Sequence, residues 1–128
     1  MNLVTGKQVF VVDDDESVCD ALCVLLGTYG FSVRVFNSAN AFFRAVPESD
    51  PGCLVLDLHM PELDGWAALN LLRDAGSARP VIIITADKKS GLKEKIMGAG
   101  AAGFLHKPFN DQELVDLIGG MSGRVNGQ

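Results

Sequence analysis

Residues 53–57 read Cys-Leu-Val-Leu-Asp, and residues 81–85 read Val-Ile-Ile-Ile-Thr. Each stretch is a continuous apolar run that ends on one polar side chain. It lacks the alternation of a strand that has one face in water. Continuous apolar strands are typical of parallel sheets whose two faces are both covered by helices. The two stretches therefore predict buried parallel strands (Cys53–Leu56 and Val81–Ile84), each followed at once by a polar residue.

Strands and helices alternate along the rest of the chain, where apolar residues recur at helical spacing between the strand-like runs. The additional strands are expected at Gln8–Val12, Ser32–Phe36 and Gly103–His106. The helices are expected at Ser17–Leu26, between Ser38 and Pro47, at Gly65–Ala75, at Ser90–Met97, and from a capping pair of Asn110 and Glu113 to near Ile118. Five strand–helix units of this length predict an α/β fold: an open, doubly wound, five-stranded parallel sheet.

The bulk properties indicate one globular domain and exclude several kinds of partner. A chain of 128 residues suits a single domain, which we place at residues 1–119, with 120–128 as a flexible tail or the start of a linker. The net charge of −5 argues against direct binding to nucleic acid or to an anionic membrane surface. The three cysteines (Cys19, Cys23 and Cys53) lack disulfide-framework spacing and fit small apolar positions in a reduced interior. We expect no secretory signal, no membrane span and a cytoplasmic location.

Polar residues follow four of the predicted strands. Asp13 and Asp14 come after the first strand, Asp57 and Thr85 after the third and fourth, and Lys107 after the fifth. Right-handed crossovers bring the carboxyl ends of parallel strands to one edge of a doubly wound sheet, where such folds bind ligands. We therefore expect three carboxylates, a hydroxyl and an ammonium group along one rim.

The three carboxylates of this rim repel one another unless they share protons or bind a cation. Oxygen ligands favour magnesium, calcium or manganese over zinc. An incomplete protein set suits Mg2+, which keeps waters and shares its shell with phosphate oxygens. Asp57 has leucine on both sides and is a candidate nucleophile, because a carboxylate can form an aspartyl-phosphate. Lys107 offers a positive charge, and Thr85 a hydroxyl, to phosphoryl oxygens.

Some of these residues also have structural interpretations. The acidic run at residues 13–16 can stabilise the first helix through its dipole, and Phe104 can be plain core. His59 and His106 are single histidines without a second histidine or cysteine at the spacing of a zinc site. A zinc centre is therefore not expected.

Four motifs resemble those of one family, and the resemblance covers about Lys7 to Gly119. They are Val-Val-Asp-Asp-Asp at 11–15, Leu-Asp-Leu-His-Met-Pro at 56–61, Thr-Ala at 85–86 and Lys-Pro-Phe at 107–109. In this combination the chain resembles the receiver domain of bacterial two-component response regulators. Arg-Val-Phe-Asn-Ser-Ala at 34–39 is similar to the nitrogen-fixation-type branch. The resemblance implies the flavodoxin-like strand order 2-1-3-4-5.

The resemblance also implies a role for each residue of the rim. Asp57 would accept a phosphoryl group from a sensor histidine kinase or a phosphotransfer protein, and Thr85 and Lys107 would contact that group. Thr85 would also act in a conformational switch together with Phe104. Mg2+ would be held by Asp13, Asp14, Asp57 and the backbone carbonyl of His59. Such a protein catalyses only its own phosphorylation and dephosphorylation, so it is not an enzyme with a separate substrate.

On the same resemblance, the face of the fourth helix, fifth strand and fifth helix would bind an output domain, a partner protein or, after phosphorylation, a second copy. His59 and Asp87 stand at positions that vary within the family and tune the lifetime of the phosphate. The chain is then a single-domain regulator or the excised regulatory domain of a helix-turn-helix transcription factor. Two other hypotheses compete. A haloacid-dehalogenase-type hydrolase would need a second aspartate where His59 stands, and the intact rim argues against a phosphate-independent scaffold.

Overall fold

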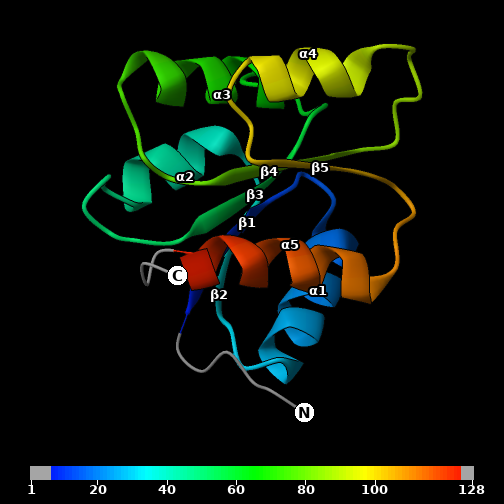
Figure 1. The fold of residues 1–128 in the computed structure, drawn as a ribbon. Coiled ribbons are helices and arrows are strands. Elements are labelled where there is room, and N and C mark those ends of the chain that lie inside the picture. Colours follow the sequence, from blue (N-terminus) through cyan, green and yellow to red (C-terminus); the bar gives the residue numbers. More distant parts are fainter. Residues whose placement is uncertain (1–6, 125–128) are drawn as a thin grey trace.

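The computed structural model describes residues 7–124 and contains one parallel sheet with helices on both faces (Figure 1). The strands are β1 (Gln8–Val12), β2 (Ser32–Phe36), β3 (Cys53–Asp57), β4 (Val81–Thr85) and β5 (Gly103–His106). The helices are α1 (Glu16–Thr28), α2 (Ala39–Ala45), α3 (Gly65–Asp74), α4 (Leu92–Gly98) and α5 (Asp111–Arg124). Every neighbouring pair is parallel and the order is β2-β1-β3-β4-β5. The predicted doubly wound α/β fold and its flavodoxin-like order are confirmed.

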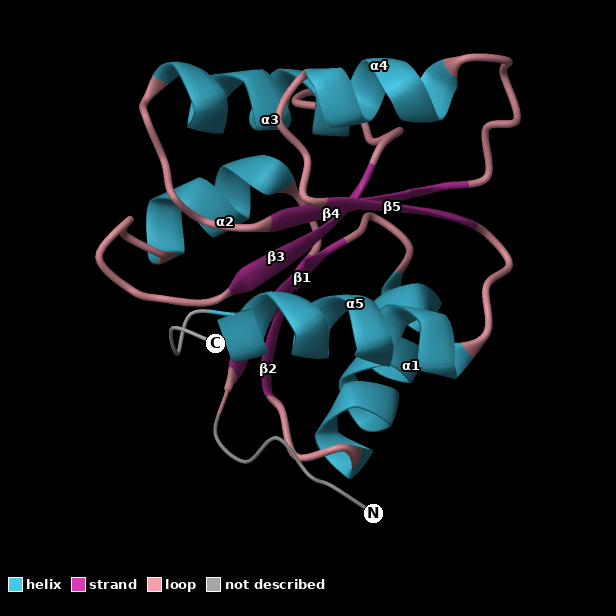
Figure 2. Ribbon diagram, viewed as in Figure 1, coloured by secondary structure: helices cyan, strands magenta, loops and turns pink. Residues whose placement is uncertain are grey.

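The central strands are apolar at every position because both of their faces are covered. Figure 2 shows α2, α3 and α4 on one side of the sheet and α1 and α5 on the other. Leu54 and Leu56 of β3 belong to the core under α2, α3 and α4, whereas Cys53 and Val55 belong to the core under α1 and α5. Successive strand residues point to opposite faces, so neither face of β3 tolerates a polar side chain without a partner. The first polar positions of β3 and β4 are accordingly their last residues.

Side-chain caps fix the starts of four helices. Asp15, Ser38 and Asp64 precede α1, α2 and α3, and each accepts a hydrogen bond from a backbone N–H two or three residues further on. Asn110 and Glu113 cap α5 reciprocally, because each side chain accepts from the backbone N–H of the other residue. Such a cap typically stabilises a helix by about 1 kcal/mol. The predicted capping pair of α5 is confirmed.

The predicted end of the last helix is wrong. α5 continues to Arg124 instead of ending near Ile118. The two glycines that follow Ile118 lower helix propensity, but glycine can adopt helical dihedrals, so they weaken the helix without ending it. Residues 120–124 of the predicted tail are therefore helical, and 125–128 lie outside the described residues. The division at residue 119 into a domain and a tail stays a prediction.

Three other helices differ from expectation at their ends. α3 ends at Asp74, one residue before the predicted Ala75. α1 is longer than the predicted Ser17–Leu26, by one residue at its start and two at its end. α4 begins at Leu92 and not at Ser90, because Gly91 has a left-handed backbone with φ of 79°, through which an α-helix cannot run. None of the helices in the described part of the chain is long and apolar enough to cross a bilayer.

Gly65 sets the close approach of α3 to the end of β3. Its N–H donates to the Leu58 carbonyl at 2.8 Å, and a Cβ added there would lie 2.6 Å from the Asp57 carbonyl oxygen. We therefore expect Gly65→Ala to lower the free energy of unfolding by about 1–3 kcal/mol, the usual effect of overpacking against backbone. Urea unfolding of the variant measures this. Gly27→Ala is the matched control, since a Cβ at this α1 position meets nothing within 4 Å. It should leave stability unchanged or raise it by up to about 1 kcal/mol, and equal effects at both positions would contradict the packing argument.

Candidate functional site

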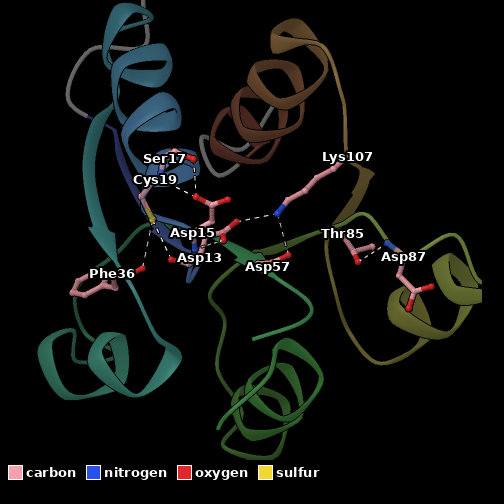
Figure 3. Close-up of polar contacts among 9 residues, drawn as sticks. All are labelled: Asp13, Asp15, Ser17, Cys19, Phe36, Asp57, Thr85, Asp87 and Lys107. Carbon is pink, nitrogen blue, oxygen red and sulfur yellow. Dashed lines mark hydrogen bonds and ion pairs between the residues drawn. The ribbon is translucent and has the colours of Figure 1, made fainter. Parts of the chain in front are cut away.

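The carboxyl-terminal edge of the sheet brings together side chains from three strands that are distant in the sequence (Figure 3). Asp13 follows β1, Asp57 ends β3, and Lys107 follows β5, where the Lys107–Pro108 peptide bond is cis. The Lys107 Nζ lies 3.1 Å from Asp13 Oδ2 and 3.3 Å from Asp57 Oδ1. The ammonium group therefore bridges two carboxylates that would otherwise face each other without a counter-charge.

Asp13, Asp14 and Asp57 form a cluster that can hold a metal ion. Each offers one carboxylate oxygen, and these oxygens all lie within 4.8 Å of one another. Asp13 and Asp57 are buried, whereas Asp14 is exposed. The Asp15 N–H donates to Asp13 Oδ1 at 2.9 Å and so holds that carboxylate in place. Three carboxylate oxygens, one of them on an exposed residue, fit Mg2+, which prefers oxygen ligands and retains several waters.

Burial and the adjacent charges shift the pKa values of this cluster. Burial, and then the Asp13 carboxylate, raise the pKa of Asp57 above its ordinary value, although Lys107 opposes the shift. Burial lowers the pKa of Lys107, but its hydrogen bonds and ion pairs with Asp13 and Asp57 outweigh this effect, so that pKa is raised. Lys107 is therefore cationic at neutral pH. One cation among three acids leaves an excess of negative charge, which favours a divalent ion at the site.

Thr85 ends β4 beside this cluster, and its side chain is hydrogen-bonded locally. The Thr85 Oγ1 accepts a hydrogen bond from the Asp87 N–H at 3.0 Å (Figure 3). Among the described residues, no hydrogen bond joins the Thr85 side chain to Asp57 or to Lys107. A hydroxyl donates as well as accepts, so this bond leaves Thr85 a proton for a phosphoryl oxygen.

Phe104 lies on β5 and is half-buried against the core under α2, α3 and α4. Its ring meets the His106 ring edge-on, with centroids 5.1 Å apart. The core interpretation of Phe104 accounts for its packing, and its role in a switch stays a prediction.

His59 and His106 both meet Asp87, a junction that the sequence did not predict. The His59 Nε2 lies 2.8 Å from Asp87 Oδ2, and the His106 Nε2 lies 2.7 Å from the Asp87 carbonyl oxygen. The hydrogen bond from His59 lowers the pKa of the Asp87 carboxyl. In the described part of the chain, Asp13, Asp14 and Asp57 are the one group of three or more potential ligands placed so that they could hold a metal ion. The role of the His59 backbone carbonyl stays a prediction.

The three cysteines are free thiols, and Cys19 and Cys53 are buried, as their interpretation as interior residues predicts. The Cys19 Sγ donates to the Asp13 carbonyl at 3.3 Å, a contact that ties α1 to the end of β1. Burial raises the pKa of the Cys53 thiol to about 12 and shifts the pKa of Cys19 in the same direction. Both side chains are therefore neutral at physiological pH.

The raised pKa of Asp57 predicts how stability depends on pH in magnesium-free buffer. Between the ordinary and the raised pKa the folded state keeps a proton that the unfolded state has lost, so the Asp57 contribution to stability falls as pH rises through that interval. We expect Asp57→Asn to remove this contribution and to be more stable than the wild-type protein at neutral pH. Denaturant unfolding from about pH 4 to pH 7 tests this. The control is Asp50→Asn, which removes an exposed carboxylate, and a wild-type protein as stable as Asp57→Asn at neutral pH would contradict the prediction.

Comparison with known proteins identifies the family. The model of the response regulator receiver domain matches residues 9–119. The chain therefore belongs to the response regulator receiver domains of two-component systems. Its relatives include the transcriptional regulatory protein FixJ of Bradyrhizobium diazoefficiens, 38% identical over 116 residues that make up 91% of this chain and 57% of FixJ. The response regulator protein TodT of Pseudomonas putida is 37% identical over 110 residues, which are 86% of this chain and 48% of TodT.

The similarity extends to solved structures. The crystal structure of FixJ-N has a TM-score of 0.81 and 36% identity, and the match covers 90% of this chain and 92% of that one. The response regulator StyR has a TM-score of 0.82 and 39% identity over 89% of this chain and 58% of StyR. These relatives confirm the resemblance to the nitrogen-fixation-type branch. The chain spans about half the length of FixJ and TodT.

Proposed function

We propose that this chain is a phosphoacceptor, in which Asp57 takes a phosphoryl group from a histidine kinase or a phosphotransfer protein. The observation that carries the proposal is the position of the Lys107 ammonium, 3.3 Å from Asp57 Oδ1, beside a cluster of three carboxylates suited to a divalent ion. A fixed cation next to a nucleophilic oxygen stabilises the charge that develops on a transferring phosphoryl group.

The proposed reaction uses the residues of the acidic cluster in separate roles. A carboxylate oxygen of Asp57 forms a bond to phosphorus while the P–N bond of a phosphohistidine breaks, and the imidazole leaves with that electron pair. Lys107 neutralises a phosphoryl oxygen, and the Thr85 hydroxyl donates to another. Asp13, Asp14 and Asp57 would hold Mg2+, with the His59 carbonyl as a further ligand, and the ion would supply charge neutralisation for the phosphoryl oxygens. The chain acts on itself and on no separate substrate.

Phosphorylation would then change the face formed by α4, β5 and α5. A phosphoryl group that draws Thr85 toward Asp57 would alter the packing beside Phe104, which lies on the same face of the sheet as α4. Shifting the population from 1:99 to 99:1 requires a preference of about 5.5 kcal/mol for the active state. The partner on this face would be an output domain, another protein or a second copy.

An output domain as the partner is supported by FixJ, a transcriptional regulatory protein. The match to this chain covers only 57% of FixJ. With a net charge of −5, residues 1–128 themselves should not bind DNA specifically. A cytoplasmic location, where a histidine kinase presents its phosphoryl group, belongs to the same proposal.

Incubation with acetyl phosphate and Mg2+ tests the proposal, with intact-mass spectrometry as the measurement. We expect a mass increase of one phosphoryl group that is lost at alkaline pH, as an acyl phosphate is. A protein whose mass stays unchanged under these conditions would contradict the phosphoacceptor function and would favour the phosphate-independent scaffold.

A further inference from the structure

Asp87 joins three segments of the chain through three different groups. Its backbone N–H donates to Thr85 Oγ1 at 3.0 Å, and its carboxylate lies 2.8 Å from the His59 Nε2. Its carbonyl oxygen lies 2.7 Å from the His106 Nε2. Because a carbonyl only accepts, the His106 Nε2 carries the proton of this bond. The start of the β4–α4 loop (residues 86–91) is therefore tied to the β3–α3 segment and to β5.

The backbone of His106 is held in the sheet, and its side chain touches the β4–α4 loop. It pairs with Thr85 in the ladder between β4 and β5, and the next residue along, Lys107, donates its N–H to the Thr85 carbonyl at 2.8 Å. Its ring also packs edge-on against Phe104. The His106 side chain thus contacts both the loop that follows Thr85 and the Phe104 ring.

Thr85 and Asp87 belong to the same short stretch of chain, and this explains why the hydrogen bond between His106 and Asp87 opposes movement of the loop. Asp87 is two residues from Thr85, and the Thr85 hydroxyl is bonded to the Asp87 N–H. A loop that follows the Thr85 side chain toward Asp57 carries the Asp87 carbonyl with it. The His106 ring cannot follow, because its backbone is fixed in β5 and its ring lies against Phe104.

We propose that His106 restrains the β4–α4 loop, and we call this restraint the latch. The hydrogen bond from His106 to the Asp87 carbonyl must break before the loop can follow Thr85 toward a phosphoryl group on Asp57. His106 is a positioning residue and touches no reacting atom. The part of this inference that concerns switching rests on the proposed function, whereas the latch itself is a property of the unphosphorylated protein.

Two substitutions separate the hydrogen bond from the ring contact. His106→Phe keeps an aromatic ring against Phe104 and removes the donor, and His106→Gln keeps an N–H donor and removes the ring. Amide hydrogen exchange in residues 86–91 of the unphosphorylated chain is the measurement. We expect His106→Phe to speed exchange of the Asp87 amide about fivefold, the fold-change of one hydrogen bond of ordinary strength. His106→Gln should stay within about twofold of the wild-type rate. Unchanged exchange in His106→Phe, or equal rates in the two variants, would overturn the latch.

Binding of beryllofluoride, a phosphoryl mimic, tests the coupling to the switch. We expect His106→Phe to bind it about fivefold more tightly than the wild-type protein, because the bond no longer has to break. Faster exchange without tighter binding would overturn the coupling and leave His106 as a local contact only. A wild-type protein that binds no beryllofluoride would contradict the proposed function, while the exchange rates would still decide whether the latch exists.

Discussion

Asp57→Asn is expected to gain no phosphoryl group from acetyl phosphate under conditions in which the wild-type protein gains one. An amide is a poor nucleophile, whereas its size and shape match those of the carboxylate, so the fold is preserved. Asp57 is the last residue of β3 and lies 3.3 Å from the Lys107 ammonium. Intact-mass spectrometry of the two proteins, treated in parallel with Mg2+, measures the difference.

The control for this loss is Asp50→Asn, which changes a carboxylate on an exposed loop away from the cluster. It should be phosphorylated as fully as the wild-type protein. If Asp57→Asn still gained the same mass, the acceptor would be another residue, and the roles given to Lys107 and to the acidic cluster would fail with it.

Removal of magnesium is expected to abolish phosphorylation and to lower the melting temperature. Asp13, Asp14 and Asp57 place three oxygens within 4.8 Å, and a bound dication relieves their mutual repulsion. A ligand that binds only the folded state at 100 times its Kd stabilises that state by about 2.7 kcal/mol. Thermal unfolding across a magnesium titration, and phosphorylation in the presence of a chelator, are the two measurements.

Asp14→Asn and Asp20→Asn form a matched pair for this prediction. Both remove one exposed carboxylate, but Asp14 belongs to the cluster and Asp20 lies on α1 outside it. We expect the magnesium-dependent rise in melting temperature to be lost in Asp14→Asn and kept in Asp20→Asn. A rise of the same size in both variants would show that the ion binds elsewhere.

The sequence predicted the parts of the fold that depend on local pattern. The apolar runs that end at Asp57 and Thr85 identified buried parallel strands, and the structure confirms that helices cover both faces of each. The meeting of strand ends at one rim followed from the handedness of βαβ units. The order of the strands did not follow from periodicity, because a crossover helix of a given length can place the next strand on either side, and it came from the resemblance to receiver domains.

The ends of helices were less predictable, because weak local signals compete there. Glycine near Ile118 indicated a helix end, yet α5 continues to Arg124, since glycine lowers helix propensity without excluding helical dihedrals. Gly91 excluded Ser90 from α4 only because its backbone is left-handed, which the sequence alone does not specify. Glycine therefore sets the boundary of α4 but not that of α5, a difference in backbone conformation that residue type alone does not reveal.

The contacts among the rim residues were only partly predictable. The approach of Lys107 to Asp57 followed from the topology of the sheet, but its shorter contact with Asp13 did not. The junction at Asp87 joins residues that are 28 and 19 positions apart and depends on the conformations of two loops. No local pattern carries such information. The one signal available was that two histidines stand close to strand ends in a chain that has only two.

The most direct test of the phosphoacceptor function is to identify the modified residue. Reduction with borohydride converts an aspartyl-phosphate into homoserine, which survives digestion and is located by tandem mass spectrometry. After treatment with acetyl phosphate and Mg2+, we expect homoserine at position 57 and at no other position. An unmodified Asp57, with the mark at Asp13 or Asp14 or with an acid-stable phosphate on a hydroxyl, would contradict the assignment of Asp57 as the acceptor.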